Sequence, residues 1–435
     1  MKAENISSVF DDVYNHVILK LFKEVKDTRK TNKSYPILDA LKSGFALFSL
    51  KSSSLFSFRT RSKSETSNLS SVYGIAKIPS DNGLRNILDE VNPDDLRSGF
   101  HRLFKYLRKT KILDSFRYWR TYLVVSIDGV EHFNSKKVSC PHCLKRTHQD
   151  GSTSHYHSML SAALVHPERS EVFILDNEPI IQQDGEEKND CERNAAKRLF
   201  EHLKTLYEHQ KMVFVMDALY SCGPLVKQLN LVSRWKYIIN IKQKGNKSLF
   251  KCWENRLERD LVKWIEKEDK EGKHRFGYTN NLPINECNSD ARVNMLYYEW
   301  TNAKKEKKVF TWLTNIKLNA KNVEKVMKMA RSRWKIENET FNTLKNQGYQ
   351  FEHNFGHGQE NLCTNFALLM MLAFCVDQIQ QSACWVFKTL LTELKTRAKL
   401  WESIRAVFKI LSVDNYHKIL LTVAEMYQIR LEYPK

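Results

Sequence analysis

Residues 331–345, R-S-R-W-K-I-E-N-E-T-F-N-T-L-K, form the segment that most constrains the fold. Apolar residues recur there and just before it at steps of three and four, which predicts a helix with one apolar stripe. The stripe comprises Met327, Ala330, Trp334, Glu337, Phe341 and Leu344. A glutamate on an apolar face is costly to bury unless something neutralises it, and a metal ion is one such partner. Glu337 is therefore a candidate metal ligand.

Two aspartates stand elsewhere at positions from which they can share that ion. Asp128 ends the run Y-L-V-V-S-I-D, and Asp217 ends M-V-F-V-M-D. Both runs are apolar and β-rich, so we expect two buried strands with a carboxylate at each C-terminal tip. Such strand ends open onto the crevice where α/β sheets bind ligands.

Each of these acids also has an ordinary structural explanation. An aspartate that ends a strand is more often a turn or cap residue. Glu337 can form a helix ion pair with Arg333, four positions earlier. Glu339 is a rival for the third position, but two residues along a helix rotate it by about 200° from Glu337, away from the stripe.

The periodicity divides the chain into five parts and predicts an α/β fold: a mixed sheet flanked by helices. We expect a helical N-terminal domain in 1–118, with a basic, serine-rich loop at 51–71. Residues 119–242 and 319–385 form the two parts of the α/β core, 243–318 a β-rich insertion, and 386–435 a helical tail. Within the core, 122–127 and 131–138 read as a hairpin that turns at Asp128-Gly129. Within the insertion, 293–300 and 308–314 read as two antiparallel strands.

Composition points to a polyanionic partner and a reducing compartment. The formal net charge of +19 favours nucleic acid, although a basic but inert surface is the alternative. The first residues are polar, so we expect no signal peptide and a cytoplasmic protein whose nine cysteines are mostly free. The apolar run 366–376 is shorter than the roughly 18 residues of a membrane span and reads as a buried helix.

The motif Cys140-Pro-His-Cys143 is a candidate half of a structural zinc site. His155 and His157 are the nearest residues that could complete it. The alternative is a pair of reduced cysteines in a tight hairpin turn.

The order Asp128, Asp217, Glu337 resembles that of the DDE transposases of bacterial insertion sequences. The likeness includes R-W-x-I-E, which ends at Glu337, and runs from about residue 37 to 385. It rests on the joint order of L-V-V-S-I-D-G (123–129), C-P-H-C (140–143), D-C-E-R-N-A-A-K-R (190–198), 337–347 and E-H-N-F-G-H-G (352–358). The cut-and-paste branch of this family has a signature of Tyr, two residues, Arg, three residues, Glu, six residues and Lys. Arg333 and Glu337 fit this signature. Ala330 stands at the Tyr position, and Lys345 comes one residue late.

The resemblance implies a ribonuclease-H-like core and metal-dependent cutting and joining of DNA. Asp128, Asp217 and Glu337 would hold two Mg²⁺ or Mn²⁺ ions, with Asp128 bridging them. The partners would be the DNA ends of the element and the target DNA. The protein would act on them as at least a homodimer. It would be a cytoplasmic bacterial protein that associates with the nucleoid when bound to DNA. A long β-rich insertion before the glutamate helix is also typical of this family.

The resemblance also suggests DNA contacts. Arg333 and Lys345 would touch phosphates or terminal bases. Trp300 and Trp312 could stack on an extruded base, although a strand tryptophan is usually a core residue. Arg59 and Arg61 could follow the phosphate backbone, although a solvated basic loop is equally consistent. Two functional alternatives stay open: a silent, transposase-derived DNA-binding protein, and a nuclease of the same fold without strand transfer.

Overall fold

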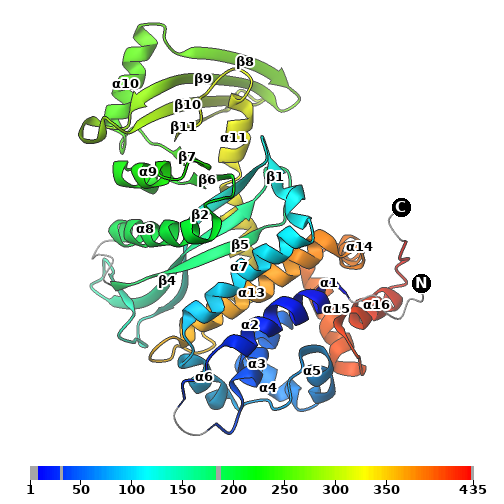
Figure 1. The fold of residues 1–435 in the computed structure, drawn as a ribbon. Helices are drawn as coiled ribbons and strands as arrows, with labels where there is room; N and C mark the ends of the chain where they lie inside the picture. The colour runs from blue at the N-terminus through cyan, green and yellow to red at the C-terminus, as the bar shows by residue number, and fades with distance from the viewer. Residues whose placement is uncertain (1–7, 30–32, 183–187, 433–435) are drawn as a thin grey trace.

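The computed structural model describes residues 8–29, 33–182 and 188–432, and the side chains of 183–190 are not described. The polar start of the chain and the side chain of Asp190 therefore lie outside the described residues. One large sheet and one helical body lie side by side (Figure 1). The middle of the chain forms the sheet, whereas both ends of the chain contribute to the helical body.

The described residues contain a sheet of eleven strands in the order β3-β4-β2-β6-β7-β11-β10-β9-β8, with β1 on β2 and β5 on β4. The strands are β1 (Arg117–Tyr118), β2 (Tyr122–Ser135), β3 (Leu144–Thr147), β4 (Thr153–Val165), β5 (Phe173–Ile180), β6 (Met212–Met216), β7 (Trp235–Asn240), β8 (Lys263–Asp269), β9 (Gly272–Pro283), β10 (Arg292–Thr301) and β11 (Lys307–Thr314).

The strands β5, β4, β2, β6 and β7 form the ribonuclease-H-like half of this sheet. Strands β2, β4 and β5 are antiparallel, and β6 and β7 then add in parallel to β2. Helix α8 (Lys188–Tyr207) makes the crossover from β5 to β6, and α9 (Gly223–Asn230) the one from β6 to β7. This topology confirms the predicted fold class, a ribonuclease-H-like mixed sheet flanked by helices.

The β-rich insertion continues the core sheet. After α10 (Lys247–Glu258), strands β8 to β11 form an antiparallel meander, and β11 pairs with β7. Strands β10 and β11 pair from Asn294 opposite Thr314 to Thr301 opposite Lys307, which confirms the predicted antiparallel pair. Short 3-10 turns, η5 (Ala218–Tyr220) and η6 (Glu286–Asn288), complete this part.

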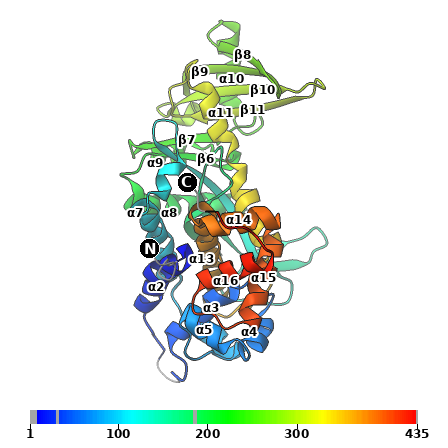
Figure 2. The same cartoon turned by 90° about the vertical axis from the view of Figure 1, so that its right-hand side faces the viewer.

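The helical body combines both ends of the chain around α13 (Figure 2). From the N-terminal side come α1 (Val9–Val13), η2 (Tyr14–Ile18), α2 (Leu19–Glu24), α3 (Ile37–Ser49), α4 (Leu55–Ser62), α5 (Thr66–Tyr73), α6 (Asp81–Asp89), α7 (Pro93–Lys109) and η3 (Ile112–Phe116). From the C-terminal side come α13 (Leu362–Ala383), α14 (Trp385–Leu394), α15 (Arg397–Ile410) and α16 (Tyr416–Met426).

Helix α13 is long and apolar enough to span a membrane by length and composition, but 94% of its apolar window is buried inside the protein. It packs against α3, α7, α1 and α6, and also against β5. The predicted buried helix is thus confirmed, and it is longer than the apolar run suggested. Its burial explains why such a hydrophobic helix needs no lipid.

Local signals explain where the helices on either side of α13 begin. Ser80 caps α6 by accepting a hydrogen bond from the Gly83 amide. Asn92 caps α7 in the same way, and Pro93 occupies the first turn, where it costs no hydrogen bond. The buried residues of α7 recur at helical spacing, from Leu96 through Leu103 to Leu107.

Two local predictions are wrong. The basic segment 51–71 is helical rather than a loop, and Lys51 is buried in an ion pair with Asp377, with 2.6 Å between Nζ and Oδ2. The second concerns the predicted hairpin at Asp128-Gly129: β2 continues through both residues to Ser135 and pairs with β4. Asp-Gly is a common turn dipeptide, but pairing with Ser161 and Leu160 of β4 keeps the strand extended through it.

Candidate functional site

Asp128 lies in the middle of β2, opposite Ser161 of β4, and not at a strand tip as predicted. The parallel pairing of β2 with β6 nevertheless stops just before it, because the last paired residues are Ser126 and Val215. Two residues further along the same register, Asp128 is level with Asp217 on the neighbouring strand. Neighbouring strands lie about 4.8 Å apart, so the two carboxylates project from adjacent points of the sheet.

Asp217 directly follows β6 and caps the 3-10 turn η5, where its Oδ1 accepts a hydrogen bond from the Leu219 amide at 2.9 Å. This placement agrees with the predicted carboxylate at a strand end. The capping role is also the ordinary explanation for an aspartate there. One carboxylate has further lone pairs, so capping and metal binding are compatible.

Glu337 does not lie on a buried stripe. Helix α11 (Val323–Arg331) ends before it, and the chain resumes as a π-helix, η7 (Ile336–Phe341), followed by α12 (Asn342–Asn346). The break and the π-helix change the direction in which later side chains point around the helix axis. The Glu337 side chain is therefore 49% exposed, and Trp334 is exposed as well. The other four residues of the predicted stripe are buried. The reason for placing Glu337 was therefore wrong, although the residue does reach the other acids.

Arg333 joins the acids of the two halves of the core. Its guanidinium lies 3.2 Å from Asp128 Oδ2 and 2.6 Å from Glu337 Oε1. The Ser126 hydroxyl donates a hydrogen bond to the Arg333 carbonyl at 3.0 Å, which ties this turn to β2. We call Asp128, Asp217, Glu337 and Arg333 the carboxylate site.

The Asp128 carboxyl is the most perturbed group of the carboxylate site. Burial raises its pKa, Arg333 lowers it, and a hydrogen bond with Glu337 together with the charges of Glu337 and Asp217 raises it again, to about 7. Arg333 contributes one positive charge, whereas the three carboxylates can carry three negative ones. The donor set thus fits hard divalent cations, which prefer carboxylate oxygens and compensate such a charge excess.

Glu339 is less exposed than Glu337, contrary to the predicted rotation away from the apolar stripe, and Glu339 is not among the groups that act on Asp128. Its charge acts on Lys335, a buried lysine whose pKa is lowered by burial against the opposing effect of Glu339. The Lys335 ammonium donates hydrogen bonds to the His166 carbonyl at 2.7 Å and to the Pro167 carbonyl at 3.2 Å. Lys335 therefore anchors this segment to the loop after β4.

Sequence reasoning missed two residues beside the carboxylate site. A Cβ added at Gly129 would lie 3.3 Å from Glu192 Oε1 on α8, so a further carboxylate lies beside the residue that follows Asp128. The Tyr220 hydroxyl is buried, and charges of Glu192, Asp217 and Asp128 add to the effect of burial in raising its pKa. Glu192 belongs to the D-C-E-R-N stretch, which was noticed only for its resemblance.

The predicted DNA contacts lie in different surroundings. Lys345 pairs with Glu352 at 2.8 Å on α12. Trp300 is half-buried and donates to the Glu271 carbonyl at 3.1 Å. Trp312 is 2% exposed and stacks on Phe310 in the core of the insertion, so no open ring face is available for base stacking.

Arg59 and Arg61 lie on α4, at the far side of the helical body from the sheet (Figure 1). Arg59 is exposed. Arg61 is partly buried and donates to the Ser52 hydroxyl at 2.6 Å. These two arginines therefore belong to a surface separate from the carboxylate site.

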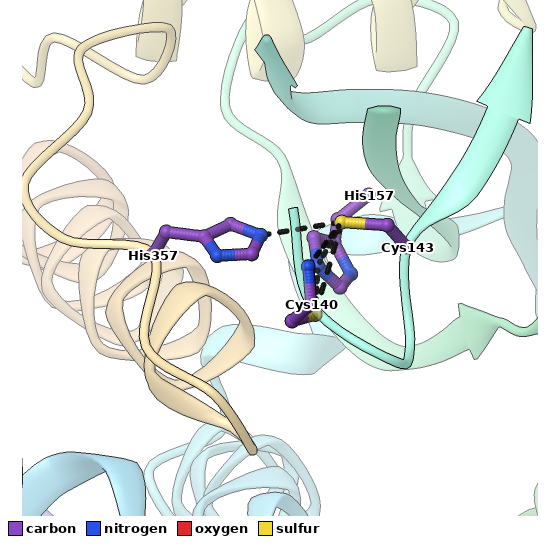
Figure 3. Close-up of side chains that lie close together, drawn as sticks. All are labelled: Cys140, Cys143, His157 and His357. Carbon is purple, nitrogen blue, oxygen red and sulfur yellow. Dashed lines mark hydrogen bonds between the residues drawn. The ribbon is translucent and has the colours of Figure 1, made fainter. Parts of the chain in front are cut away.

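A second cluster contains Cys140, Cys143, His157 and His357 (Figure 3). Their ligand atoms all lie within 4.8 Å of one another. The prediction of His157 agrees with this cluster, but that of His155 is wrong, because His155 precedes His157 by two residues, or about 7 Å along β4. His357 completes the cluster from a loop distant in sequence, which no local spacing could reveal.

One comparison with known proteins identifies a family. The sequence matches the family model described as the transposase DDE domain over residues 139–375, which include Asp217 and Glu337 and begin after Asp128. Among solved structures, the chain is similar to a piggyBac transposase in a synaptic complex with hairpin DNA. That likeness has 10% sequence identity and a TM-score of 0.42, and covers 99% of this chain and 87% of the other. No curated protein sequence matches the chain.

Proposed function

Since the chain belongs to the transposase DDE domain family, we propose that it cuts phosphodiester bonds at the ends of its own DNA element and joins those ends to target DNA. Asp128, Asp217 and Glu337 are the proposed catalytic, metal-binding acids. The observation that carries this proposal is that three acids far apart in sequence gather around Arg333. Titratable groups that shift the pKa values of one another are common at functional sites.

The proposed reaction is an in-line attack by water, and later by a DNA 3′-hydroxyl, on a phosphodiester. Two bound Mg²⁺ or Mn²⁺ ions would supply activation of the attacking oxygen and stabilisation of the leaving one. Asp128, Asp217 and Glu337 would hold these ions, because the charges of Glu337 and Asp217 both act on Asp128. Asp128 must be ionised for this role, and a bound divalent cation would favour its carboxylate over the protonated form.

Arg333 has a separate proposed role. In the absence of cations its guanidinium neutralises Asp128 and Glu337. When those acids bind cations, the same guanidinium is free to donate two parallel hydrogen bonds to a DNA phosphate. Arg333 would thus hold the scissile strand beside the acids.

DNA is the proposed partner, and the net charge of +19 supports a polyanion. Bringing two element ends into one complex requires at least two protomers, so we propose a homodimer in the DNA complex. The nine cysteines are free thiols, which is consistent with the proposed cytoplasmic, nucleoid-associated location in a bacterium.

Cleavage of labelled DNA from the element ends tests the proposal. The purified protein should nick that DNA in Mg²⁺ or Mn²⁺ but not in EDTA, and should join the released 3′ ends to a plasmid. Asp128→Asn should lower the cleavage rate roughly 1,000-fold, because the loss of one metal ligand raises the activation barrier by about 4 kcal/mol. Binding of the same DNA in EDTA should change little.

Glu339→Gln is the matched control, since Glu339 lies two residues from Glu337 but faces Lys335. It should cut at close to the parent rate. Normal cutting by Asp128→Asn would disprove the assignment of the acids. Nicking without joining would instead support a nuclease of this family, and binding without nicking a silent protein.

A further inference from the structure

The four residues of the second cluster come from three separate parts of the chain (Figure 3). Cys140 and Cys143 lie in the connection between β2 and β3, and His157 lies in β4. His357 lies in the connection between α12 and α13, which follows the segment that carries Glu337. Such a convergence cannot arise from one local turn.

The distances between the ligand atoms match a tetrahedral site. The two Sγ atoms are 3.7 Å apart, and His157 Nε2 lies 3.3 Å from Cys140 Sγ and 3.4 Å from Cys143 Sγ. His357 Nε2 lies 3.3 Å from Cys143 Sγ. Zinc–sulfur bonds of about 2.3 Å and zinc–nitrogen bonds of about 2.0–2.1 Å in a tetrahedron separate the ligands by roughly 3.3–3.8 Å.

The surroundings hold the four side chains in place. Cys143, His157 and His357 are buried, and Cys140 is partly buried. The Cys140 amide points at Cys143 Sγ at 3.4 Å, and the Gln182 side chain donates to the Cys143 carbonyl at 2.6 Å. The His357 ring packs on Phe133 at 4.3 Å between centroids.

Gly358, directly after His357, adopts a backbone conformation that favours glycine. Gly358 has a φ of +73°, and a Cβ there would come within 2.3 Å of Asp89 Oδ1. Asp89 accepts backbone hydrogen bonds from Gln359, Glu360, Asn361 and Leu362 at 2.8–3.1 Å. The loop is therefore fixed on one side by α6 and on the other by the cluster.

We propose that Cys140, Cys143, His157 and His357 bind one structural Zn²⁺ ion. On binding, both thiols release their protons to solvent, and two thiolates, two neutral imidazoles and Zn²⁺ give a site without net charge, which suits burial. A tetrahedral set of two sulfurs and two nitrogens selects zinc over Mg²⁺ or Mn²⁺. A disulfide is the competing state, but the Sγ atoms are well beyond the roughly 2.05 Å of an S–S bond.

This ion would cross-link the two parts of the core. It would fasten the loop between α12 and α13 to β4 and to the β2–β3 connection. The chain segment that carries Glu337 would then be held at its C-terminal side independently of DNA and of the ions at the carboxylate site. Zinc therefore has a structural role here and takes no part in the reaction.

Metal analysis of protein purified without added metal or chelator tests the binding site. The parent should carry one zinc per chain, and Co²⁺ in place of zinc should give the absorption of a tetrahedral site with sulfur-to-cobalt charge transfer. Cys143→Ser and His357→Asn should each weaken zinc binding by more than about 100-fold. Substitutions of residues that only hold a metal ligand in place already weaken binding by roughly 10- to 100-fold. His155→Asn is the matched control and should keep one zinc.

The proposal would be overturned if the parent protein is isolated without zinc and then binds neither added Zn²⁺ nor added Co²⁺. A disulfide between Cys140 and Cys143 in freshly prepared, reduced protein, or full zinc in His357→Asn, would do the same. Should a variant fail to fold, the cobalt titration of the parent still decides. None of these measurements uses DNA, so their failure is distinct from failure of the proposed transposase activity.

Hydrogen exchange tests the structural role. Removing zinc from the parent with a chelator should speed amide exchange in residues 352–361, because the loop loses one of its two attachments. Exchange in β9 and β10, on the far side of the sheet, should stay unchanged. Equal protection of 352–361 with and without zinc would contradict the role as a cross-link.

Discussion

At the scale of single residues, Arg333 determines the state of the carboxylate site. It neutralises Asp128 and Glu337 at 3.2 Å and 2.6 Å. A lysine there would keep the charge but lose the planar fork that can contact two acceptors at once. The same fork is what the proposed phosphate contact requires.

We expect Arg333→Lys to lower DNA cleavage by about 10- to 150-fold, which corresponds to one charge-assisted hydrogen bond of roughly 1.5–3 kcal/mol. Single-turnover cleavage at saturating DNA measures this effect. Lys345→Arg is the control, since Lys345 pairs with Glu352 instead. An unchanged rate in Arg333→Lys would mean that Arg333 only balances charge.

The single residues differ in how far the sequence could predict them. Asp217 lies at the strand end that its local sequence predicted, whereas Asp128 lies within a strand and Glu337 lies off the predicted apolar stripe. Glu192 and His357 were missed because their neighbours in space lie far away in the chain. Trp312 shows the opposite error: its burial depends on packing within the insertion, which its strand pattern alone does not reveal.

At the scale of elements, the start of α13 depends on Asp89. The first amides of a helix lack partners within the helix, and Asp89 accepts hydrogen bonds from four amides at this end. Its negative charge also interacts favourably with the helix dipole. One side chain from α6 thus fixes the beginning of the central helix of the body.

We expect Asp89→Ala to lower the free energy of unfolding by roughly 0.5–2 kcal/mol, as for the loss of a helix cap. Urea unfolding followed by circular dichroism measures this change. The exposed Asp414 offers a matched control in Asp414→Ala, which should change stability far less. Equal stability of both variants would show that solvent replaces the cap.

The sequence predicted several helices and strands, but not where β2 ends or where the helix before Glu337 breaks. Strands β10 and β11 lie close to the predicted ranges 293–300 and 308–314, whereas α10, β8 and β9 were not predicted. The continuous β2 and the break between α11 and η7 were not predicted either, since one is stabilised by pairing with β4 and the other by contacts of Arg333 and Lys335. Tertiary contacts therefore overrode local pattern at the positions that build the site.

At the scale of the whole molecule, one buried network joins the helical body to the sheet. Arg97 of α7 contacts Asp176 of β5 through two nitrogens, at 2.5 Å and 2.8 Å, and Glu178 at 2.6 Å. His202 of α8 also contacts Asp176 at 2.7 Å. Such a network leaves uncompensated buried charge when one partner is removed.

We expect Arg97→Ala to destabilise the protein by roughly 3–5 kcal/mol, because the buried Asp176 loses its partner. Thermal or urea unfolding measures it. Arg102→Ala, which breaks an exposed pair with Glu24, should have a much smaller effect. A similar decrease in the free energy of unfolding in both variants would mean that any truncation in helix α7 destabilises the protein, and that the network contributes nothing specific.

The same network predicts how stability depends on pH. Burial raises the pKa of Asp176, but hydrogen bonds from His202 and Arg97 outweigh it and leave the pKa below its ordinary value. The stabilisation is therefore present above about pH 4, the pKa of an unfolded aspartate, and is lost as the pH falls through the lower folded value. The unfolding free energies of the parent and of Asp176→Asn should converge below pH 4, and a constant difference would contradict this.

The most direct test of the account is a structure of the protein with element-end DNA and Mn²⁺, in which anomalous scattering locates the metal. We expect manganese bound by oxygens of Asp128, Asp217 and Glu337, with Arg333 turned from the acids to a DNA phosphate. Manganese absent from these three acids, or Arg333 still bridging Asp128 and Glu337 in the presence of bound DNA and Mn²⁺, would contradict the account.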